Sequence, residues 1–242
     1  MKTLLASLAL LLVPSLSLAA APATQPDNTP PPGFKALFTG TDLTNWKVPE
    51  GDNGHWRVVN GIIDYDGKSE GKKDKDLWSA ETYGDFTMQV DWRWSGPAKK
   101  VKHPHVLPDG THKKDAAGAV IQEEVMEAGD SGIYVRGNSK SQINIWCWNC
   151  GSGEVYGYRM DAKMPPDVIA GVTPKRNMDK PIGEWNKMEI TMKGDRLSVS
   201  LNGEEVITNA KLPGVPAKGP VALQHHGDAI QFKNIYIKTL GE

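Results

Sequence analysis

The chain has 242 residues, and its 28 Lys and Arg side chains nearly balance its 29 Asp and Glu side chains, for a formal net charge of −1 at pH 7. A chain this close to neutral, without a basic stripe, lacks the electrostatic surface that nucleic-acid-binding domains need. Nucleic acid is therefore not an expected partner. The length suits one domain with a well-buried core and falls short of two typical domains.

The N-terminal segment has the pattern of a secretory signal peptide. Lys2 precedes an apolar stretch over residues 4–18, and alanines follow at positions 19–21. A positive start, an apolar run and a small-residue exit are the parts of such a signal, and a membrane-spanning helix would need roughly 20 apolar residues. We therefore expect residues 1–20 to direct export to the periplasm or the medium, with no membrane partner once they are removed.

Residues 21–33 are rich in Pro, Thr and Asn, with prolines at 30, 31 and 32. They contain too few apolar side chains to build a core, so their composition predicts an extended tether. The folded domain is then expected over residues 34–242.

Residues 86–94 show the clearest period-two pattern, in which apolar and polar side chains alternate. The apolar positions are Phe86, Met88, Val90, Trp92 and Trp94. Such alternation is typical of a half-buried strand. The same pattern recurs in short segments with Gly and Pro between them, and no helical stretch of ten residues follows residue 20. This predicts an all-β, two-sheet antiparallel sandwich.

Two details of the strand pattern are specific. Asn202 and Gly203 follow an alternating segment and predict a tight type I′ hairpin turn, because both central positions of that turn need a positive φ. Near the C-terminus, Ile230 and Ile235 lie in opposite phases of the alternation. A one-residue slip of this kind, around Lys233 and Asn234, predicts a β-bulge.

Five strand-like segments carry unusual side chains on the face turned away from the expected core. These outward residues are Gln122, Glu124, Tyr134, Arg136, Gln142, Asn144, Trp146, Glu154, Tyr156, Tyr158, Gln224 and His226. Alternate positions on neighbouring strands converge on one surface. Carboxylates, amides and aromatic rings there suit a sugar, whose hydroxyls bind polar groups and whose C–H face lies on a ring. The alternative is an ordinary polar sheet face, on which Thr, Lys and Ser would predominate.

Cys147 and Cys150 form a CxxC motif. A redox site would need a helix start beside a βαβ unit, and a zinc site would need two further ligands. In an oxidising compartment a local disulfide is the favoured interpretation, and a reduced, partly buried pair is the alternative.

A Lys- and Pro-rich segment over residues 96–117 is expected to be a long loop. His103, His105 and His112 in it could bind a metal, although a solvated or substrate-capping loop is favoured. Glu124 and Glu154 could pair across strands as the carboxylates of a retaining glycosidase, which lie about 5 Å apart. The chain has no ExDxE run of the laminarinase kind, which counts against a conventional glycosidase.

Seven segments, in order along the chain, resemble the 3-keto-disaccharide hydrolase domain family. They are residues 34–46 (FKALFTGTDLTNW), 83–86 (YGDF), 130–136 (DSGIYVR), 183–186 (GEWN), 201–203 (LNG), 223–227 (LQHHG) and 232–235 (FKNI). The resemblance spans nearly all of residues 34–240. It departs from the family pattern at residues 140–145 (KSQINI), which keep Gln142 but lack the usual carboxylates, and at Asp130 and His225. The chain is therefore similar to a divergent branch.

The resemblance implies a concanavalin-like jelly roll that acts on glycosides already oxidised to a ketone at C3. Such a ketone acidifies the C2 proton, so a base can remove it, the C1 oxygen leaves by elimination, and water adds back. This chemistry needs a base near C2, an electrophile or metal at the ketone, and an acid at the leaving oxygen.

We expect Glu154 or Glu124 to be the base, and His226 to be the acid or the donor to the ketone. The candidate substrate-binding residues are Arg136, Gln142, Trp146, Tyr156, Gln224, His225 and Asp130. No cofactor is certain, and a divalent metal, either structural Ca²⁺ or catalytic, is an open alternative. The rival hypotheses are a carbohydrate-binding, lectin-like module without chemistry, and a surface domain that binds protein through the same face.

Overall fold

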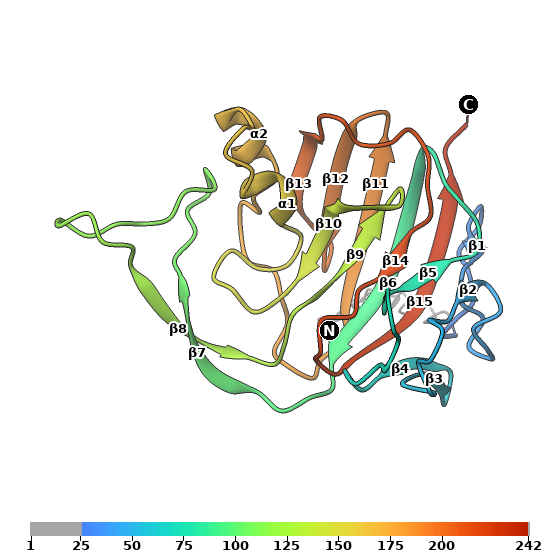
Figure 1. Cartoon of the computed structure of the whole chain (residues 1–242). Helices are drawn as coiled ribbons and strands as arrows, with labels where there is room; N and C mark the ends of the chain where they lie inside the picture. The colour runs from blue at the N-terminus through green and yellow to red at the C-terminus, as the bar shows by residue number, and fades with distance from the viewer. Residues whose placement is uncertain (1–25, 242) are drawn as a thin grey trace, which may run out of the picture.

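Two antiparallel β-sheets face each other across one hydrophobic core in the computed structural model, which describes residues 26–241 (Figure 1). This confirms the predicted fold class. The predicted signal peptide, residues 1–20, lies outside the described residues. No helix in residues 26–241 is long and apolar enough to cross a membrane.

The larger sheet has eight strands within the described residues. They are β1 (Lys35–Ala36), β3 (Trp56–Val59), β4 (Ile62–Tyr65), β6 (Phe86–Trp94), β11 (Asn186–Lys193), β12 (Arg196–Leu201), β13 (Glu204–Lys211) and β15 (Ile230–Thr239). Their spatial order is β13-β12-β11-β6-β15-β4-β3, with β1 paired to β15. The two longest strands, β6 and β15, are paired with each other near the middle of this sheet.

The smaller sheet, with five strands in residues 26–241, has the order β10-β9-β14-β5-β2. Its strands are β2 (Trp46–Lys47), β5 (Leu77–Ser79), β9 (Ser131–Val135), β10 (Asn138–Ile145) and β14 (Ala222–Leu223). The remaining elements are β7 (Lys99–Pro104), β8 (Gln122–Glu127), α1 (Tyr156–Arg159) and α2 (Pro166–Gly171). In Figure 1 the smaller sheet covers the larger one, and α1 and α2 lie beside β10 and β13.

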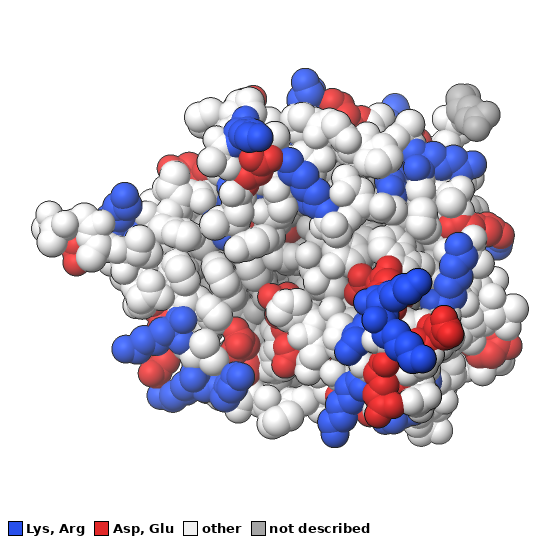
Figure 2. All heavy atoms as spheres, in the orientation of Figure 1, with Lys and Arg blue, Asp and Glu red and all other residues white. Residues whose placement is uncertain are grey.

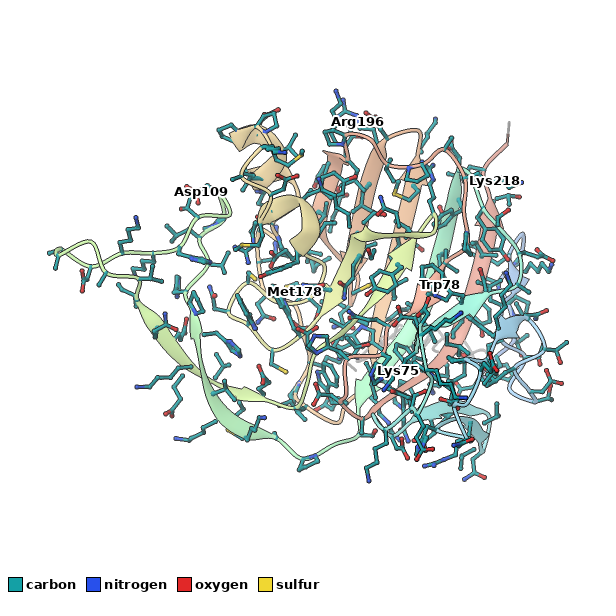
Figure 3. All side chains as sticks on the ribbon, in the orientation of Figure 1. Lys75, Trp78, Asp109, Met178, Arg196 and Lys218 are labelled. Carbon is teal, nitrogen blue, oxygen red and sulfur yellow. The ribbon has the colours of Figure 1, made fainter. Side chains whose placement is uncertain are left out.

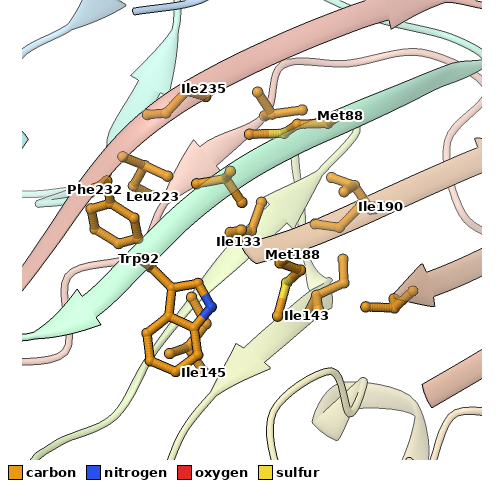
Figure 4. Packing of buried hydrophobic residues seen from close by; sticks show 14 of the residues in the cluster. Met88, Trp92, Ile133, Ile143, Ile145, Met188, Ile190, Leu223, Phe232 and Ile235 are labelled. Carbon is orange, nitrogen blue, oxygen red and sulfur yellow. The ribbon is translucent and has the colours of Figure 1, made fainter. Parts of the chain in front are cut away.

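The core forms where the alternating apolar residues of both sheets meet. Strand β6 alternates buried and half-buried residues over its whole length, as predicted. Figure 4 shows Trp92 and Met88 of β6 packed among Ile133 and Ile143 of the smaller sheet and Met188 of β11. Burying apolar area of this kind supplies most of the favourable free energy of folding.

The predicted turn and bulge are confirmed. Asn202 and Gly203 have φ of 54° and 89°, as a type I′ turn requires, and they join β12 to β13. The register of β15 against β6 shifts between Lys233 and Tyr236, where Asn234 has a φ of 52°.

Residues 26–33, expected to belong to a tether, are instead tied to β15. The backbone N–H of Asn28 donates to Asn234 Oδ1 at 2.7 Å, and the Asn28 side chain donates to the Gly61 carbonyl at 2.8 Å. Asp27 also forms an ion pair with Lys233 at 2.7 Å. The segment has few apolar side chains, but hydrogen bonds and an ion pair of its short polar side chains hold it against the folded domain.

The predicted loop over residues 96–117 is wrong in part, because β7 and β8 form a two-stranded arm. The arm extends away from the sandwich in Figure 1, and its far end turns back, so that Asp109 lies near the helices in Figure 3. Lys175 Nζ fixes this return by donating to the Pro108 carbonyl at 2.8 Å.

Candidate functional site

The outer face of the smaller sheet brings polar side chains from separate strands into rows. Asn144 on β10 pairs with Gly132 on β9, and the backbone N–H of Gln224 donates to the Gly132 carbonyl at 2.9 Å. Trp146 and His226 follow Asn144 and Gln224 by two residues, and Asp130 precedes Gly132 by two residues. These three residues lie just beyond the ends of the strands, and they line the same cavity.

Glycines make room for this arrangement. A Cβ on Gly132 would collide with the side-chain amide of Gln142, which lies across it. Gly129 has a φ of 154°, and a Cβ there would meet the side chain of Asp228. The chain therefore enters β9 close to Asp228, whose Oδ2 accepts from the backbone N–H of Asp130 at 3.0 Å. The glycines thus fix both the amides and the position of Asp130.

These rows line a cavity of about 230 Å³. Its lining residues are Asp130, Gln142, Asn144, Trp146, Trp148, Tyr156, Gln224 and His226. Six of them were predicted as site residues from the sequence. The other two were not predicted as site residues. Asn144 was predicted only to face outward on the strand that carries Gln142, and Trp148 drew notice only as a residue between Cys147 and Cys150.

The amides of the cavity are held in place by hydrogen bonds. Gln142 Nε2 donates to Gln224 Oε1, and Ser131 Oγ donates to the Gln224 carbonyl at 3.0 Å. The side-chain amide of Asn144 has no hydrogen-bond partner among the described residues, although Asn144 is only 3% exposed. It is therefore available to a ligand in the cavity as both donor and acceptor.

Aromatic rings form one wall of the cavity. The Trp146 and Trp148 rings stack with centroids 4.3 Å apart and planes 7° apart. His103 of β7 stacks on Trp148 at 4.6 Å, so the arm supports this wall. Tyr156 meets Trp146 edge to face at 6.1 Å. An aromatic wall beside amides and a carboxylate is the combination that suits a sugar ring.

Two carboxyl groups near His226 have raised pKa values. Burial raises the pKa of Asp130 to about 6; the charge of His226 opposes this and that of Asp228 adds to it. Burial also raises the pKa of Asp76 to about 7, although the Asp76 carboxylate accepts from the backbone N–H of His225 at 2.7 Å. A carboxylate with a pKa near neutrality can both take up and release a proton under ordinary conditions.

The face around the cavity carries few charges. Figure 2 shows Lys, Arg, Asp and Glu side chains mainly around the margin of this face, including the region of Lys75, with few over its centre. The site therefore suits a neutral polar ligand better than a strongly charged one.

Glu154, the favoured base, lies outside the cavity. Its side chain is fully buried in an ion pair with Arg159, and Cys150 Sγ lies 3.6 Å from Glu154 Oε2. The segment that was expected to be a strand turns at Tyr156 into α1, where Met160 N–H donates to the Tyr156 carbonyl at 2.9 Å. The turn leaves Tyr156 in the cavity and directs Glu154 inward.

Arg136, predicted to bind the substrate, is not among the residues that line the cavity. It is 2% exposed, and its guanidinium forms an ion pair with Asp85 at 2.8 Å. It also donates to three backbone carbonyls, those of Gly84, Gly194 and Pro216. Arg136 has a φ of 55°, which takes its side chain off the alternation of β9 and into the body of the sandwich.

Glu124 and His225 also lie away from the cavity lining. Glu124 is exposed on β8, where it forms an ion pair with Lys100 at 2.7 Å. It therefore cannot pair with the buried Glu154. His225 contacts the Tyr65 hydroxyl through its Nδ1 and does not line the cavity, whereas the next residue, His226, does. The base of a site in this cavity must therefore be a residue other than Glu154 or Glu124, whereas His226, the predicted acid, lines the cavity.

The predicted disulfide is absent, because Cys147 and Cys150 are free thiols. The two side chains point into different surroundings: Cys150 packs with Val106 and Trp146, whereas Cys147 packs against the main core. Among residues 26–241 no group of three or more His, Cys, Asp or Glu side chains could hold a metal ion. A divalent metal stays a prediction.

Comparison with known proteins places the chain in a family. The model of a family described as the 3-keto-alpha-glucoside-1,2-lyase-like domain matches residues 33–238. A 3-keto-disaccharide hydrolase of Bacteroides thetaiotaomicron is 21% identical, and the match covers 86% of this chain and 79% of that protein.

Two solved structures of candidate glycosyl hydrolases from Parabacteroides distasonis share the fold. One has a TM-score of 0.59 at 19% identity and covers 89% of this chain and 100% of its own. The other has a TM-score of 0.58 at 20% identity and covers 93% and 95%. Because the family model matches nearly the whole described domain, the resemblance seen in the sequence is confirmed, and the chain belongs to the 3-keto-alpha-glucoside-1,2-lyase-like domain family.

Proposed function

We propose that this protein cleaves glycosides whose sugar carries a ketone at C3, and that the cavity on the smaller sheet is its active site. The observation that supports this most is the meeting of Asp130 and His226 in a cavity lined by amides and indoles. Family membership and the B. thetaiotaomicron relative support the same substrate class. The partner is thus a carbohydrate, bound with its C–H face toward the aromatic wall.

Asp130 replaces Glu154 as the proposed base. With a pKa of about 6, Asp130 is mostly ionised at pH 7 and lines the cavity. Its carboxylate would remove the C2 proton, and the electron pair left at C2 would form the C1–C2 double bond as the C1–O bond breaks. His226 would protonate the leaving oxygen. Water would then add at C1 while C2 regains a proton, which completes net hydrolysis.

The amides would hold the sugar during these steps. Gln142 is fixed by Gln224, and the unpaired amide of Asn144 offers a donor to the developing enolate oxygen or to a hydroxyl. Positioned donors of this kind stabilise negative charge as it forms. No step requires two carboxylates about 5 Å apart.

The test is turnover of 3-keto-trehalose and a 3-keto-glucoside by purified protein, followed as release of 3-keto-glucose, with and without EDTA. We expect release by the unmodified protein and by Asp167→Asn, a control at an exposed position on α2. Release by Asp130→Asn should be about 10²–10⁴-fold slower. Loss of activity in EDTA would assign a metal to the ketone. Binding of these sugars without release would instead favour the carbohydrate-binding module, which the missing carboxylates of residues 140–145 support.

Export to the periplasm or the medium remains a proposal from the pattern of residues 1–20. N-terminal sequencing of protein recovered from the fractionated host would test it. A new N-terminus near residue 21 in the exported fraction supports export, and an intact Met1 in the cytosolic fraction contradicts it.

A further inference from the structure

A second cavity, of about 420 Å³, lies at the end of the sandwich where β6 finishes and the loop before β11 crosses. Its lining residues are Trp92, Trp94, Met126, Trp146, Cys147, Asn177, Asp179, Lys180, Pro181 and Ile182. The proposed function uses none of them except Trp146, which lines both cavities. We call this the end cavity.

The walls of the end cavity are mainly apolar. Three of its residues are tryptophans, and two others, Met126 and Ile182, are large apolar side chains that are 49% and 38% exposed. Exposed side chains of this type in one cavity, beside buried indoles, are typical of a site for an apolar ring. A ligand that covers these side chains removes their apolar surface from water, which is favourable for binding.

Two buried polar atoms of the lining residues have no partner. Among the described residues nothing bonds Trp92 Nε1 or Asp179 Oδ1, although Trp92 is only 1% exposed. The other oxygen of Asp179 accepts from the backbone N–H of Ser152 at 2.8 Å, which fixes the carboxylate. Burial raises the pKa of Asp179 to about 6, so it is mostly ionised at neutral pH. Unpaired buried groups are unfavourable unless a ligand or water satisfies them.

We propose that the end cavity binds a small, uncharged aromatic molecule that carries a hydroxyl group. The ring matches the indole walls, and the hydroxyl supplies the donor that Asp179 Oδ1 lacks. Its oxygen is also an acceptor of the kind that the Trp92 N–H lacks. A cationic ligand is disfavoured because Lys180 lines the same cavity, and a sugar would leave most of its hydroxyls against apolar walls.

The site does not depend on the proposed hydrolysis, but the two cavities share Trp146. The aromatic hydroxyl could therefore belong to the leaving group of a bound glycoside or to a separate molecule. In both cases Asp179 would bind an aromatic hydroxyl. The two cases differ in whether that aromatic ring is attached to the sugar.

Titration calorimetry with 4-methylphenol and 1,4-dimethylbenzene isolates the hydroxyl, because the two probes differ only by a hydroxyl in place of a methyl group. A hydrogen bond to a charged group predicts a preference of roughly tenfold or more for the phenol. Asp179→Asn should remove this preference and leave the affinity for 1,4-dimethylbenzene unchanged, since its amide oxygen still accepts from Ser152. Asp167→Asn, at an exposed position, is the matched control and should keep the preference.

Equal affinity of the unmodified protein for both probes, or no binding of either, would overturn the proposal. These two titrations decide it even if Asp179→Asn does not fold, and they require no turnover. A comparison of KM for 4-hydroxyphenyl and 4-methylphenyl 3-keto-glucosides then identifies the source. A lower KM for the hydroxyphenyl compound that Asp179→Asn abolishes assigns the site to the leaving group. Equal KM values, with 4-methylphenol still bound, assign it to a separate ligand.

Discussion

Asp130 and Glu154 lie in two regions that differ mainly in access. Burial raises the pKa of both carboxyl groups. Asp130 lines a cavity that it shares with the exposed His226, whereas Glu154 is sealed beneath α1 with Arg159. A raised pKa therefore does not by itself identify a catalytic group, because burial raises the pKa of Glu154 even though its ion pair with Arg159 opposes the shift. The two carboxyl groups are distinguished by their position, because Asp130 lines the cavity and Glu154 does not.

Asp130→Asn should have the largest effect on activity and little effect on stability. The amide keeps the shape of the side chain but cannot accept the C2 proton, so kcat/KM should fall about 10²–10⁴-fold. The fold should persist because Asp130 donates its hydrogen bond to Asp228 from its backbone N–H, which the substitution leaves in place. Steady-state kinetics and a urea melt measure the two quantities. A fall in stability that matches the loss of activity would remove Asp130 from the mechanism.

Arg159→Met should affect stability first. It leaves the Glu154 carboxylate buried without its partner, which typically costs about 3–5 kcal/mol of unfolding free energy. Adding Glu154→Gln to this variant should restore much of the loss, because no unpaired charge is then left. Urea denaturation of the single and double variants measures the coupling.

The activity of the folded Glu154→Gln variant completes this test. We expect it to stay within a few-fold of the unmodified protein, because Glu154 does not line the cavity. A well-folded Glu154→Gln protein as inactive as Asp130→Asn would return Glu154 to the mechanism.

The alternation of apolar residues was enough to predict the sandwich, because the strands of its core each bury one face. The outward residues of β9, β10 and β14 were found by the same rule, apart from Arg136, whose positive φ breaks it. Glu154, Tyr156 and Tyr158 also alternate, but three positions cannot distinguish a strand from the first turn of a helix. The arm was missed because β7 has no buried face, so its sequence carries no apolar pattern.

The pH dependence of kcat/KM should show an acidic limb near pH 6. Protonated Asp130 cannot act as a base, so activity should rise about tenfold per pH unit below its pKa of about 6 and level off above it. The limb should be absent from the residual activity of Asp130→Asn. A limb that persists in this variant would assign the titration to another group.

Trp148→Ala should weaken sugar binding moderately. The indole lies between Trp146 and His103 in the aromatic wall, and an aromatic pair contributes about 0.5–1.5 kcal/mol beyond its buried area. We expect KM to rise by up to roughly tenfold and kcat to change less. The matched control is Trp78→Ala on β5, which stacks on Tyr134 outside the cavity lining. An equal rise in KM in both variants would argue against a specific role for the wall.

Glu124→Gln should have the smallest effect, although Glu124 was one of the two candidate bases predicted from the sequence. Its carboxylate pairs with Lys100 on the exposed arm, and an exposed pair of this kind contributes about 0–1 kcal/mol. Neither kcat nor KM should change, and the small loss of stability should shrink further in high salt, which screens exposed charges. Steady-state kinetics check the first point, and urea denaturation at two salt concentrations checks the second. A large loss of kcat would mean that the arm closes over the cavity during turnover and brings Glu124 to the sugar, since in this structure Glu124 is not among the residues that line it.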